Sequence, residues 1–291
     1  MNDSRDALEQ ACATAGIDAE GARLLRVGSN AVYRLKPPVI VRVSRPGADA
    51  GQVRRTVAVA RWLESARYPV ARAVDVDQPV AADGHLVTFW DAVSDDGDQY
   101  ASTAEVADVL VKLHALTVPD DLRLPELAPF ANAPQRIETS TWLNPDDRAY
   151  LITMLARMRA DYDGLEFALP PGVIHGDANV GNVLRDHHGN PVVIDLDGFA
   201  VGPREWDLAL TAIYYDSFGW HTHQEYEDFV RVYGFDIMAW PGYPVMRAVR
   251  EFLMVTWVIQ KAAESEQAAA EAAKRIAALR TGASRNDWQP Y

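Results

Sequence analysis

The chain has 291 residues, 48% of them hydrophobic and 24% charged, which is the composition of a folded protein with one large or two smaller domains. No apolar run approaches the roughly 20 residues of a membrane-spanning helix, and the first residues lack the pattern of a signal peptide. The single cysteine, Cys12, excludes an internal disulfide and a multi-cysteine zinc site. These features predict a cytoplasmic protein without a membrane partner.

Charge is unevenly distributed along the chain. With 28 Lys and Arg against 41 Asp and Glu, the net charge is −13, which argues against a nucleic-acid partner. Residues 1–70 carry 11 basic and 7 acidic side chains, a net of +4, and residues 71–291 carry 17 and 34, a net of −17. An anionic ligand at the first part and a cationic one at the second would suit this asymmetry. The alternative is that the acidity only aids solubility.

The first 93 residues are predicted to form strands with an embedded helix. Apolar residues at helical spacing cover 2–15 and 52–66. Runs rich in β-branched residues and bounded by Gly, Pro and Asp predict strands. We expect two strands around a turn within 26–35, and further strands at 39–43, 73–76 and 85–90.

The pattern becomes mainly helical after the turn-rich residues 94–97. We expect helices over 103–116, 144–163, 206–215, 224–233, 245–263 and 267–279, short strands at 172–174 and 192–194, and a proline-rich surface segment at 118–134. The sequence therefore predicts an α+β protein of two lobes with a cleft between them. The small β-rich lobe covers residues 1–93, and the larger helical lobe covers residues 94–291.

The segment 173–201 carries oxygen ligands at the ends of two apolar strands. The first strand leads into His175-Gly176-Asp177, with Asn182 five residues after Asp177, and the second ends in Asp195. Two carboxylates and a carboxamide suit Mg²⁺, which prefers one or two carboxylates together with substrate phosphates. A carboxylate left free of metal can orient an attacking hydroxyl and accept its proton. The alternative, that Asp177 and Asp195 only cap turns, fits this combination of spacing and flanking strands less well.

The H-G-D-x4-N loop and the I-D-L-D segment resemble the catalytic loop and the metal-binding segment of the aminoglycoside phosphotransferase family, small-molecule kinases with a protein-kinase-like fold. The resemblance covers nearly the whole chain and implies Asp177 as catalytic base, with Asn182 and Asp195 as Mg²⁺ ligands. It makes His175 a structural residue of the loop. It also makes Asp207, in W-D-L-A, a helix N-cap and a brace for the loop.

The same resemblance places the nucleotide in the first lobe. The turn that contains Ser29 and Asn30 matches the nucleotide-covering loop, although such a turn is more often an ordinary hairpin. Arg42 stands where the family has a phosphate-pairing lysine, and Thr56 stands where a glutamate normally pairs with it. We expect Arg42 to contact the α/β-phosphates through its forked guanidinium; the alternative is a surface arginine on an edge strand.

The same resemblance implies that the nucleotide base lies near the end of 85–93, hydrogen-bonded to the Trp90 carbonyl and the Ala92 N–H. This pattern does not distinguish ATP from GTP. A cationic acceptor would be met by acidic residues after Asp207, and the candidates are Asp216, Glu225, Glu227, Asp228, Glu251 and Glu264.

These observations predict a Mg²⁺-dependent kinase that moves the γ-phosphoryl group of ATP or GTP to a hydroxyl of a small molecule, with an aminoglycoside-like or other antibiotic as the first candidate. An amino alcohol or a sugar is the alternative acceptor. A nucleotide-binding pseudokinase or scaffold is the alternative from another class, favoured by Arg42 and Thr56 at the usual lysine and glutamate positions. The sequence leaves the choice between monomer and dimer open.

Overall fold

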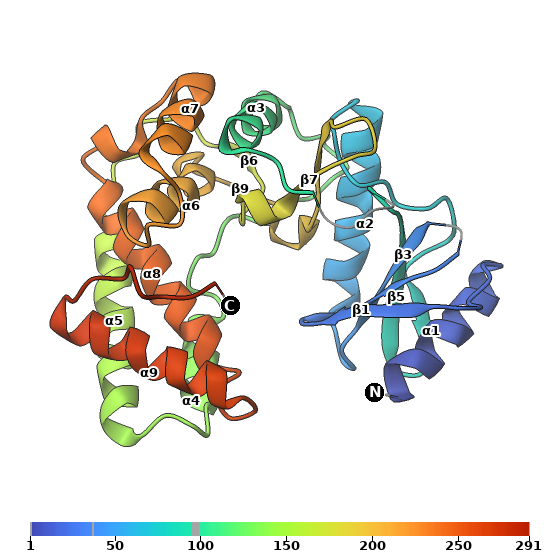
Figure 1. The fold of residues 1–291 in the computed structure, drawn as a ribbon, viewed down its shortest axis with the longest axis horizontal. Coiled ribbons are helices and arrows are strands. Elements are labelled where there is room, and N and C mark those ends of the chain that lie inside the picture. Colours follow the sequence, from blue (N-terminus) through green and yellow to red (C-terminus); the bar gives the residue numbers. More distant parts are fainter. Residues whose placement is uncertain (1, 37, 95–98, 291) are drawn as a thin grey trace. The chain divides into compact units, whose positions relative to one another are not determined.

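The computed structural model describes residues 2–36, 38–94 and 99–290. The chain forms two compact units (Figure 1), of which the first comprises Met1–Pro125 and Asn179–Ala200, and the second Glu126–Ala178 and Val201–Tyr291. The turn expected at 94–97 lies, apart from Ser94, outside the described residues. These compact units are divided at positions other than residue 93. The lobe limit expected at residue 93 stays a prediction.

An antiparallel sheet forms the centre of the first unit. Its strands, among the residues the structure describes, follow the order β1-β2-β3-β5-β4, with each neighbouring pair antiparallel. They are β1 (Arg23–Val27), β2 (Asn30–Arg34), β3 (Val39–Ser44), β4 (Val80–Ala82) and β5 (His85–Asp91). Gly28 and Ser29 form the turn between β1 and β2, as the sequence predicts.

The two faces of this sheet have different roles. One face packs against α1 (Asn2–Ala15), and the shared core contains Ala7, Leu8, Ala11, Cys12, Tyr33, Val41, Val43, Val87 and Phe89. Since strand side chains alternate between faces, Arg42 points to the opposite face. Its register partners there are Val32 on β2 and Thr88 on β5. Because of this alternation, the core side chains lie on one face of the sheet and Arg42 lies on the other.

Further elements complete the first unit. They are the helices α2 (Ala50–Ser65) and α3 (Thr103–His114), the hairpin of β7 (Val183–Arg185) and β8 (Pro191–Val193), and the 3₁₀ turns η1 (Val180–Asn182) and η2 (Leu196–Gly198). α2 begins at Asp49, whose side chain accepts a hydrogen bond from the Gly51 N–H at 2.8 Å. α3 begins with a capping box between Ser102 and Glu105.

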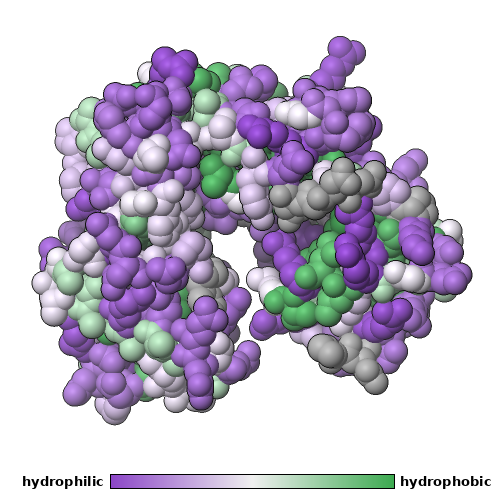
Figure 2. Space-filling view, viewed as in Figure 1, coloured by the Kyte–Doolittle hydropathy of each residue, from purple (hydrophilic) through white to green (hydrophobic). Residues whose placement is uncertain are grey.

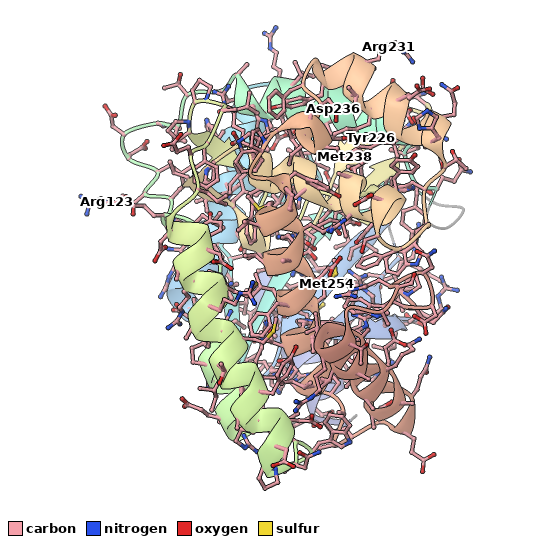
Figure 3. All side chains as sticks on the ribbon, turned by 90° about the vertical axis from the view of Figure 1, so that its left-hand side faces the viewer. Arg123, Tyr226, Arg231, Asp236, Met238 and Met254 are labelled. Carbon is pink, nitrogen blue, oxygen red and sulfur yellow. The ribbon has the colours of Figure 1, made fainter. Side chains whose placement is uncertain are left out.

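The second unit is mainly helical. Its helices are α4 (Ala133–Thr139), α5 (Pro145–Asp163), α6 (Glu205–Asp216), α7 (His223–Tyr233), α8 (Tyr243–Ile259) and α9 (Glu266–Thr281), with the 3₁₀ turn η3 (Ile237–Ala239). The apolar α8 packs against α4, α5, α6 and α9 and is therefore the central helix of this unit. Tyr226 of α7 donates a hydrogen bond at 2.7 Å to Asp236, next to η3 (Figure 3). β6 (Gly172–Ile174) pairs with β9 (Ala200–Gly202), whose last two residues belong to this unit.

Most predicted elements are present, and the exceptions are short. The strand expected at 73–76 is wrong: Ala73 forms only an isolated bridge to Trp90. The sequence analysis missed the three-residue strands β4, β7 and β9, and also α4, which begins inside the proline-rich segment expected at the surface.

The described helices include none that is both long and apolar enough to cross a bilayer. The face in Figure 2 is mostly hydrophilic, with apolar surface in the region of β1. Leu24, Leu25 and Val27 of β1 are exposed, Val27 to 67%. Cys12 is buried, and this burial raises the pKa of its thiol to about 11.

Candidate active site

In the second unit, the loop after β6 is held by a buried carboxylate. The N–H groups of His175 and Gly176 donate to the two oxygens of Asp207, at 2.7 Å and 2.8 Å, and Asp207 is 1% exposed. Asp207 thus braces the loop. Its expected N-cap role is wrong, because Arg204 precedes α6 and Asp207 is the third residue of the helix.

This brace sets the direction of the Asp177 carboxylate. Gly176 has a φ of +86°, a left-handed conformation that glycine adopts without a steric cost, and so the chain turns sharply just before Asp177. The Asp177 N–H donates to His175 Nδ1 at 3.3 Å, and His175 is 2% exposed. His175 is therefore a structural residue in this geometry, while the Asp177 side chain is 58% exposed.

Arg250 of α8 is the cation next to Asp177. Its Nη2 lies 3.5 Å from Asp177 Oδ1, and its guanidinium lies 4.4 Å from the centre of the Trp206 ring. Trp206 also donates through Nε1 to the Gly176 carbonyl at 2.8 Å. Burial lowers the pKa of Arg250, and the negative charge of Asp177 opposes that shift. The sequence analysis missed Arg250, because it lies 73 residues from Asp177 and no motif connects the two.

In the first unit, the two proposed metal ligands lie on adjacent backbone segments. The Asn182 carbonyl accepts a hydrogen bond at 2.9 Å from the N–H of Ile194, the residue before Asp195. Asn182 and Asp195 are thirteen residues apart in the sequence. The antiparallel hairpin of β7 and β8 lies between them and brings their backbones together. Asn182 is the last residue of the 3₁₀ turn η1, which Asn179 caps through its side chain.

Asp195 has an unusual backbone. Its φ of 59° and ψ of 61° place it in the left-handed region, which Asp and Asn enter more readily than other non-glycine residues. Among the described residues there is no group of three or more His, Cys, Asp and Glu side chains that could hold a metal. One carboxylate and one carboxamide nevertheless fit Mg²⁺, because this ion normally keeps waters and binds substrate phosphates.

Arg42 of β3 contacts the segment that carries Asp195. Its Nη2 lies 3.5 Å from Asp195 Oδ1 and also forms an ion pair with Asp197 Oδ2. Thr56 of α2 donates its hydroxyl to Asp197 Oδ1 at 3.0 Å. The sequence analysis gave no role to Asp197, the second aspartate of I-D-L-D, because the resemblance predicts the partner of this cation on the helix and not on this segment.

A cavity of about 420 Å³ lies on the Arg42 face of the sheet. Arg42, Trp90, Ala92 and Asp195 all line it, together with apolar side chains that include Val32, Ile40, Leu184 and Leu196. Its combination of charged side chains and apolar walls suits a nucleotide.

One predicted contact with the nucleotide base needs correction. The Ala92 N–H donates to the Pro38 carbonyl at 2.9 Å and so is already used within the protein. Val93 and Ser94 follow Ala92 along the same wall of the cavity.

Ser29 and Asn30 line a second, smaller cavity of about 210 Å³. Arg42, Thr56 and Asp197 line it as well. The turn before Asn30 is held by Arg45, whose Nη2 donates to the Gly28 carbonyl at 3.1 Å. Arg42 thus lines both cavities, and Ser29 and Asn30 lie on the smaller one.

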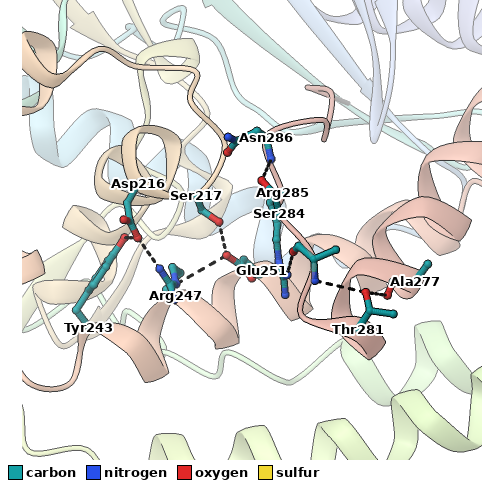
Figure 4. Close-up of polar contacts among 11 residues, drawn as sticks. Asp216, Ser217, Tyr243, Arg247, Glu251, Ala277, Thr281, Ser284, Arg285 and Asn286 are labelled. Carbon is teal, nitrogen blue, oxygen red and sulfur yellow. Dashed lines mark hydrogen bonds and ion pairs between the residues drawn. The ribbon is translucent and has the colours of Figure 1, made fainter.

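Two of the acidic residues considered for a cationic acceptor are engaged by arginines (Figure 4). Asp216 lies 2.5 Å from Arg247, and Glu251 lies 3.1 Å from Arg285. Glu251 also accepts from the Ser217 hydroxyl at 2.5 Å. Of the others, Glu225 closes the capping box of α7, while Glu227 and Asp228 contact the side chains of His223 and Arg231.

A family model and a curated relative match this chain. The family model of the phosphotransferase enzyme family (APH) matches residues 22–249. A probable ketoamine kinase of Lactiplantibacillus plantarum is 31% identical over 150 residues, which are 46% of this chain and 53% of that protein. The chain thus spans about half the length of this curated relative.

Two solved structures share the fold. An amicoumacin kinase in complex with AMP-PNP and Ca²⁺ has a TM-score of 0.74 at 14% identity, covering 99% of this chain and 96% of that one. A microcompartment-associated aminopropanol kinase has a TM-score of 0.73 at 18% identity, covering 94% of each chain. The fold class predicted from the sequence, a kinase-like fold with a β-rich N-terminal part and a helical C-terminal part, is confirmed.

Proposed function

Because the chain belongs to the phosphotransferase enzyme family, we propose that it is a Mg²⁺-dependent kinase that phosphorylates a hydroxyl of a small molecule with ATP or GTP. The observation that carries this proposal is the cavity of the first unit, whose wall holds both Arg42 and Asp195. A cation for phosphates and a carboxylate for a metal on one wall are what a bound nucleoside triphosphate needs.

In this proposal the first unit binds the nucleotide. The base lies against the apolar wall near Trp90 and the residues that follow it. Arg42 donates to phosphate oxygens, since the contacts it makes within the described residues both use Nη2 and leave Nε and Nη1 for an anion. Ser29 and Asn30 lie on the adjoining cavity beside Arg42 and are proposed to approach the phosphates.

Asn182 and Asp195 are proposed to hold the metal. When bound there, Mg²⁺ would supply positive charge that offsets the negative charge developing on the transferred phosphoryl group. The backbone hydrogen bond between Asn182 and Ile194 keeps the two ligand segments together.

Asp177 is proposed to act on the acceptor. Its carboxylate accepts the proton of the acceptor hydroxyl as the oxygen forms a bond to the γ-phosphorus, and the bond from that phosphorus to the β–γ bridging oxygen breaks. The products are the phosphorylated acceptor and the nucleoside diphosphate. Asp207 fixes the loop through two backbone hydrogen bonds and thereby fixes the direction from which Asp177 acts.

For the acceptor we propose a small hydroxyl compound that also carries an amine. An aminoglycoside-like or other antibiotic is the candidate that the sequence predicts. A ketoamine is the second candidate, favoured by the name of the relative that is 31% identical, and an amino alcohol is the alternative that the sequence analysis offers. The arginine partners of Asp216 and Glu251 also favour an acceptor of low positive charge, because these carboxylates are already engaged.

The test compares the wild-type chain with Asp177→Asn. Nucleoside diphosphate release is measured across a panel of aminoglycosides, other antibiotics, ketoamines, amino alcohols and sugars, and ATP affinity is measured on both proteins. We expect turnover of at least one acceptor by the wild type, and a loss of about 10²–10⁴-fold in the variant with ATP affinity retained. ATP binding without turnover of any acceptor would favour the pseudokinase alternative instead.

A further inference from the structure

The residues Arg42, Thr56 and Asp197 form a contact network that the resemblance does not predict. In the family pattern the cation of the central strand pairs with a glutamate of the following helix, and that helix here offers Thr56. The structure nevertheless gives Arg42 a carboxylate partner, and this carboxylate comes from η2.

We infer that Asp197 is the positioning residue of Arg42 and takes the part that the helix glutamate plays elsewhere. Asp197 Oδ2 pairs with Arg42 Nη2, and Asp197 Oδ1 accepts from the Thr56 hydroxyl at 3.0 Å. Each oxygen of the carboxylate therefore has its own donor. Thr56 is 5% exposed, and its single hydroxyl proton has two acceptors within reach, of which Asp197 Oδ1 at 3.0 Å is nearer than the Gln52 carbonyl at 3.2 Å.

The arginine is the charged partner of this network that is better shielded from water. The Arg42 side chain is 19% exposed and that of Asp197 is 38% exposed, so water screens the pair only in part. Charge-assisted hydrogen bonds are roughly twice as strong as neutral ones. The network therefore holds the guanidinium in one orientation, with Nε and Nη1 available for a phosphate.

A second consequence is that the phosphate contact and the metal segment are coupled. Asp195 and Asp197 flank one residue of the same 3₁₀ turn, and Arg42 Nη2 lies within 3.5 Å of Asp195 as well. A shift of this turn would move the metal ligand and the arginine together. An arginine suits this arrangement better than a lysine, because its donors form a fixed fork that reaches two partners at once.

This inference rests on the proposed nucleotide binding, and a double-mutant cycle tests it. Calorimetry at saturating Mg²⁺ measures ATP and adenosine affinity for the wild type, Arg42→Ala, Asp197→Asn and the double variant. We expect Arg42→Ala to weaken ATP binding roughly tenfold and Asp197→Asn several-fold. The double variant should match Arg42→Ala alone, because Asp197 acts through Arg42. Adenosine affinity should stay equal in all four proteins.

Other outcomes overturn the inference in distinct ways. If the losses of ATP affinity caused by Arg42→Ala and by Asp197→Asn multiply in the double variant, Asp197 acts independently of Arg42. If Asp197→Asn also raises the Mg²⁺ requirement in the Arg42→Ala background, Asp197 is a metal ligand. Unchanged ATP affinity in Asp197→Asn would remove its positioning role. A wild type that fails to bind ATP would refute the proposed function itself, before the cycle is measured.

Thr56→Val provides a second, milder probe that keeps every charge. It replaces the hydroxyl with a methyl group of similar size and leaves Asp197 without one donor. We expect a smaller loss of ATP affinity than in Asp197→Asn, and no loss at all when Asp197 is already Asn. A full effect of Thr56→Val in the Asp197→Asn background would show that Thr56 acts by packing only and would contradict the network.

Discussion

At the scale of single residues, Asp195 combines a costly backbone with a charged side chain. A left-handed conformation costs a non-glycine residue roughly 1–2 kcal/mol, somewhat less for Asp and Asn. Its φ of 59° is therefore a local strain that the surrounding fold maintains, at a position where the side chain reaches the wall of the larger cavity. Strain of this kind gathers at functional sites, which is consistent with the proposed metal ligand.

The two proposed ligands should contribute unequally. Asp195→Asn keeps a residue that tolerates the left-handed backbone but removes the negative charge, whereas Asn182→Ala removes a neutral oxygen. We expect the Mg²⁺ concentration that supports half-maximal ATP binding to rise roughly tenfold or more in Asp195→Asn and less in Asn182→Ala. A Mg²⁺ titration at fixed ATP measures both.

Adenosine is the control ligand for this comparison, because it carries no phosphate for the metal to bridge. Its affinity should be equal in both variants and the wild type. A larger effect of Asn182→Ala than of Asp195→Asn would reverse the ranking of the two ligands.

At the scale of elements, the first turn of α6 holds the loop that follows β6. Asp207→Asn exchanges one accepting oxygen for an NH₂ group that faces a backbone N–H, since the carboxylate accepts from both His175 and Gly176. A buried donor left without an acceptor costs about 1–3 kcal/mol. We expect the free energy of unfolding to fall by that amount, as measured by urea denaturation.

Turnover of Asp207→Asn should fall as well, while ATP affinity stays near that of the wild type. Glu138→Gln, which alters an exposed carboxylate of the same unit that has no proposed role, is the matched control and should change neither quantity. Wild-type stability in Asp207→Asn would contradict the role of Asp207 as a brace.

The start of α3 is tied to β7 by an ion pair with a predictable pH response. The hydrogen bond from Arg185, at 2.6 Å, lowers the pKa of Glu105 to about 2 from its usual 4.5. A carboxyl group whose pKa is lower in the folded state stabilises the fold fully above about pH 4.5, and this contribution is lost as the pH falls toward about 2.

Glu105→Gln should remove this contribution while keeping the capping box, which accepts either residue. We expect the difference in unfolding free energy between wild type and variant to be constant above about pH 5 and to shrink between about pH 4.5 and pH 2. Urea denaturation at a series of pH values measures it. A difference that does not depend on pH would show that the charge of Glu105 contributes nothing.

Sequence reasoning found the elements whose own residues determine them. The long amphipathic helices and the β-branched strands carry a clear period, and most of their limits agree with the structure within a few residues. The three-residue strands β4, β7 and β9 and the seven-residue helix α4 were missed because they show too little of a period. The strand expected at 73–76 failed because its pairing is limited to one bridge from Ala73.

The residues of the candidate site also fall into two groups, those that a local motif reveals and those that depend on distant partners. Asp177, Asn182 and Asp195 were found from a local motif, and their roles stay proposals. Arg250 and Asp197 were found only in the structure, because each depends on a partner more than 70 residues away. The Ala92 N–H was assigned from position alone, and its hydrogen bond to Pro38 depends on a neighbouring strand that the pattern does not reveal.

At the scale of the whole molecule, the chain passes between its two compact units at 125–126, 178–179 and 200–201. Asp177 is the last residue but one before the second passage, and Asn182 follows it closely in the first unit. The proposed base and the proposed metal ligands thus belong to different units. Asp177 and Asn182 are nevertheless only five residues apart in the sequence.

The charge of the whole molecule leads to a test of the acceptor. Residues 71–291 carry 17 basic and 34 acidic side chains, a net of −17, which should attract a cationic acceptor. Such attraction is screened by salt, with a Debye length of about 10 Å at 0.1 M ionic strength. The pairs Asp216–Arg247 and Glu251–Arg285 neutralise part of this field within the second unit. The dependence of kcat/KM on salt concentration therefore shows how strongly the remaining negative charge attracts the acceptor.

For a cationic acceptor we expect kcat/KM to fall several-fold between about 0.03 M and 0.3 M NaCl, mainly through a higher KM, and for a neutral acceptor to stay within about twofold. Initial rates are measured at saturating ATP and Mg²⁺, so that the salt dependence of nucleotide binding does not enter. A cationic and a neutral acceptor of similar size provide the internal control. The same salt response for both would mean that the acidity of this part of the chain serves solubility only, and that acceptor choice depends on shape and hydrogen bonding.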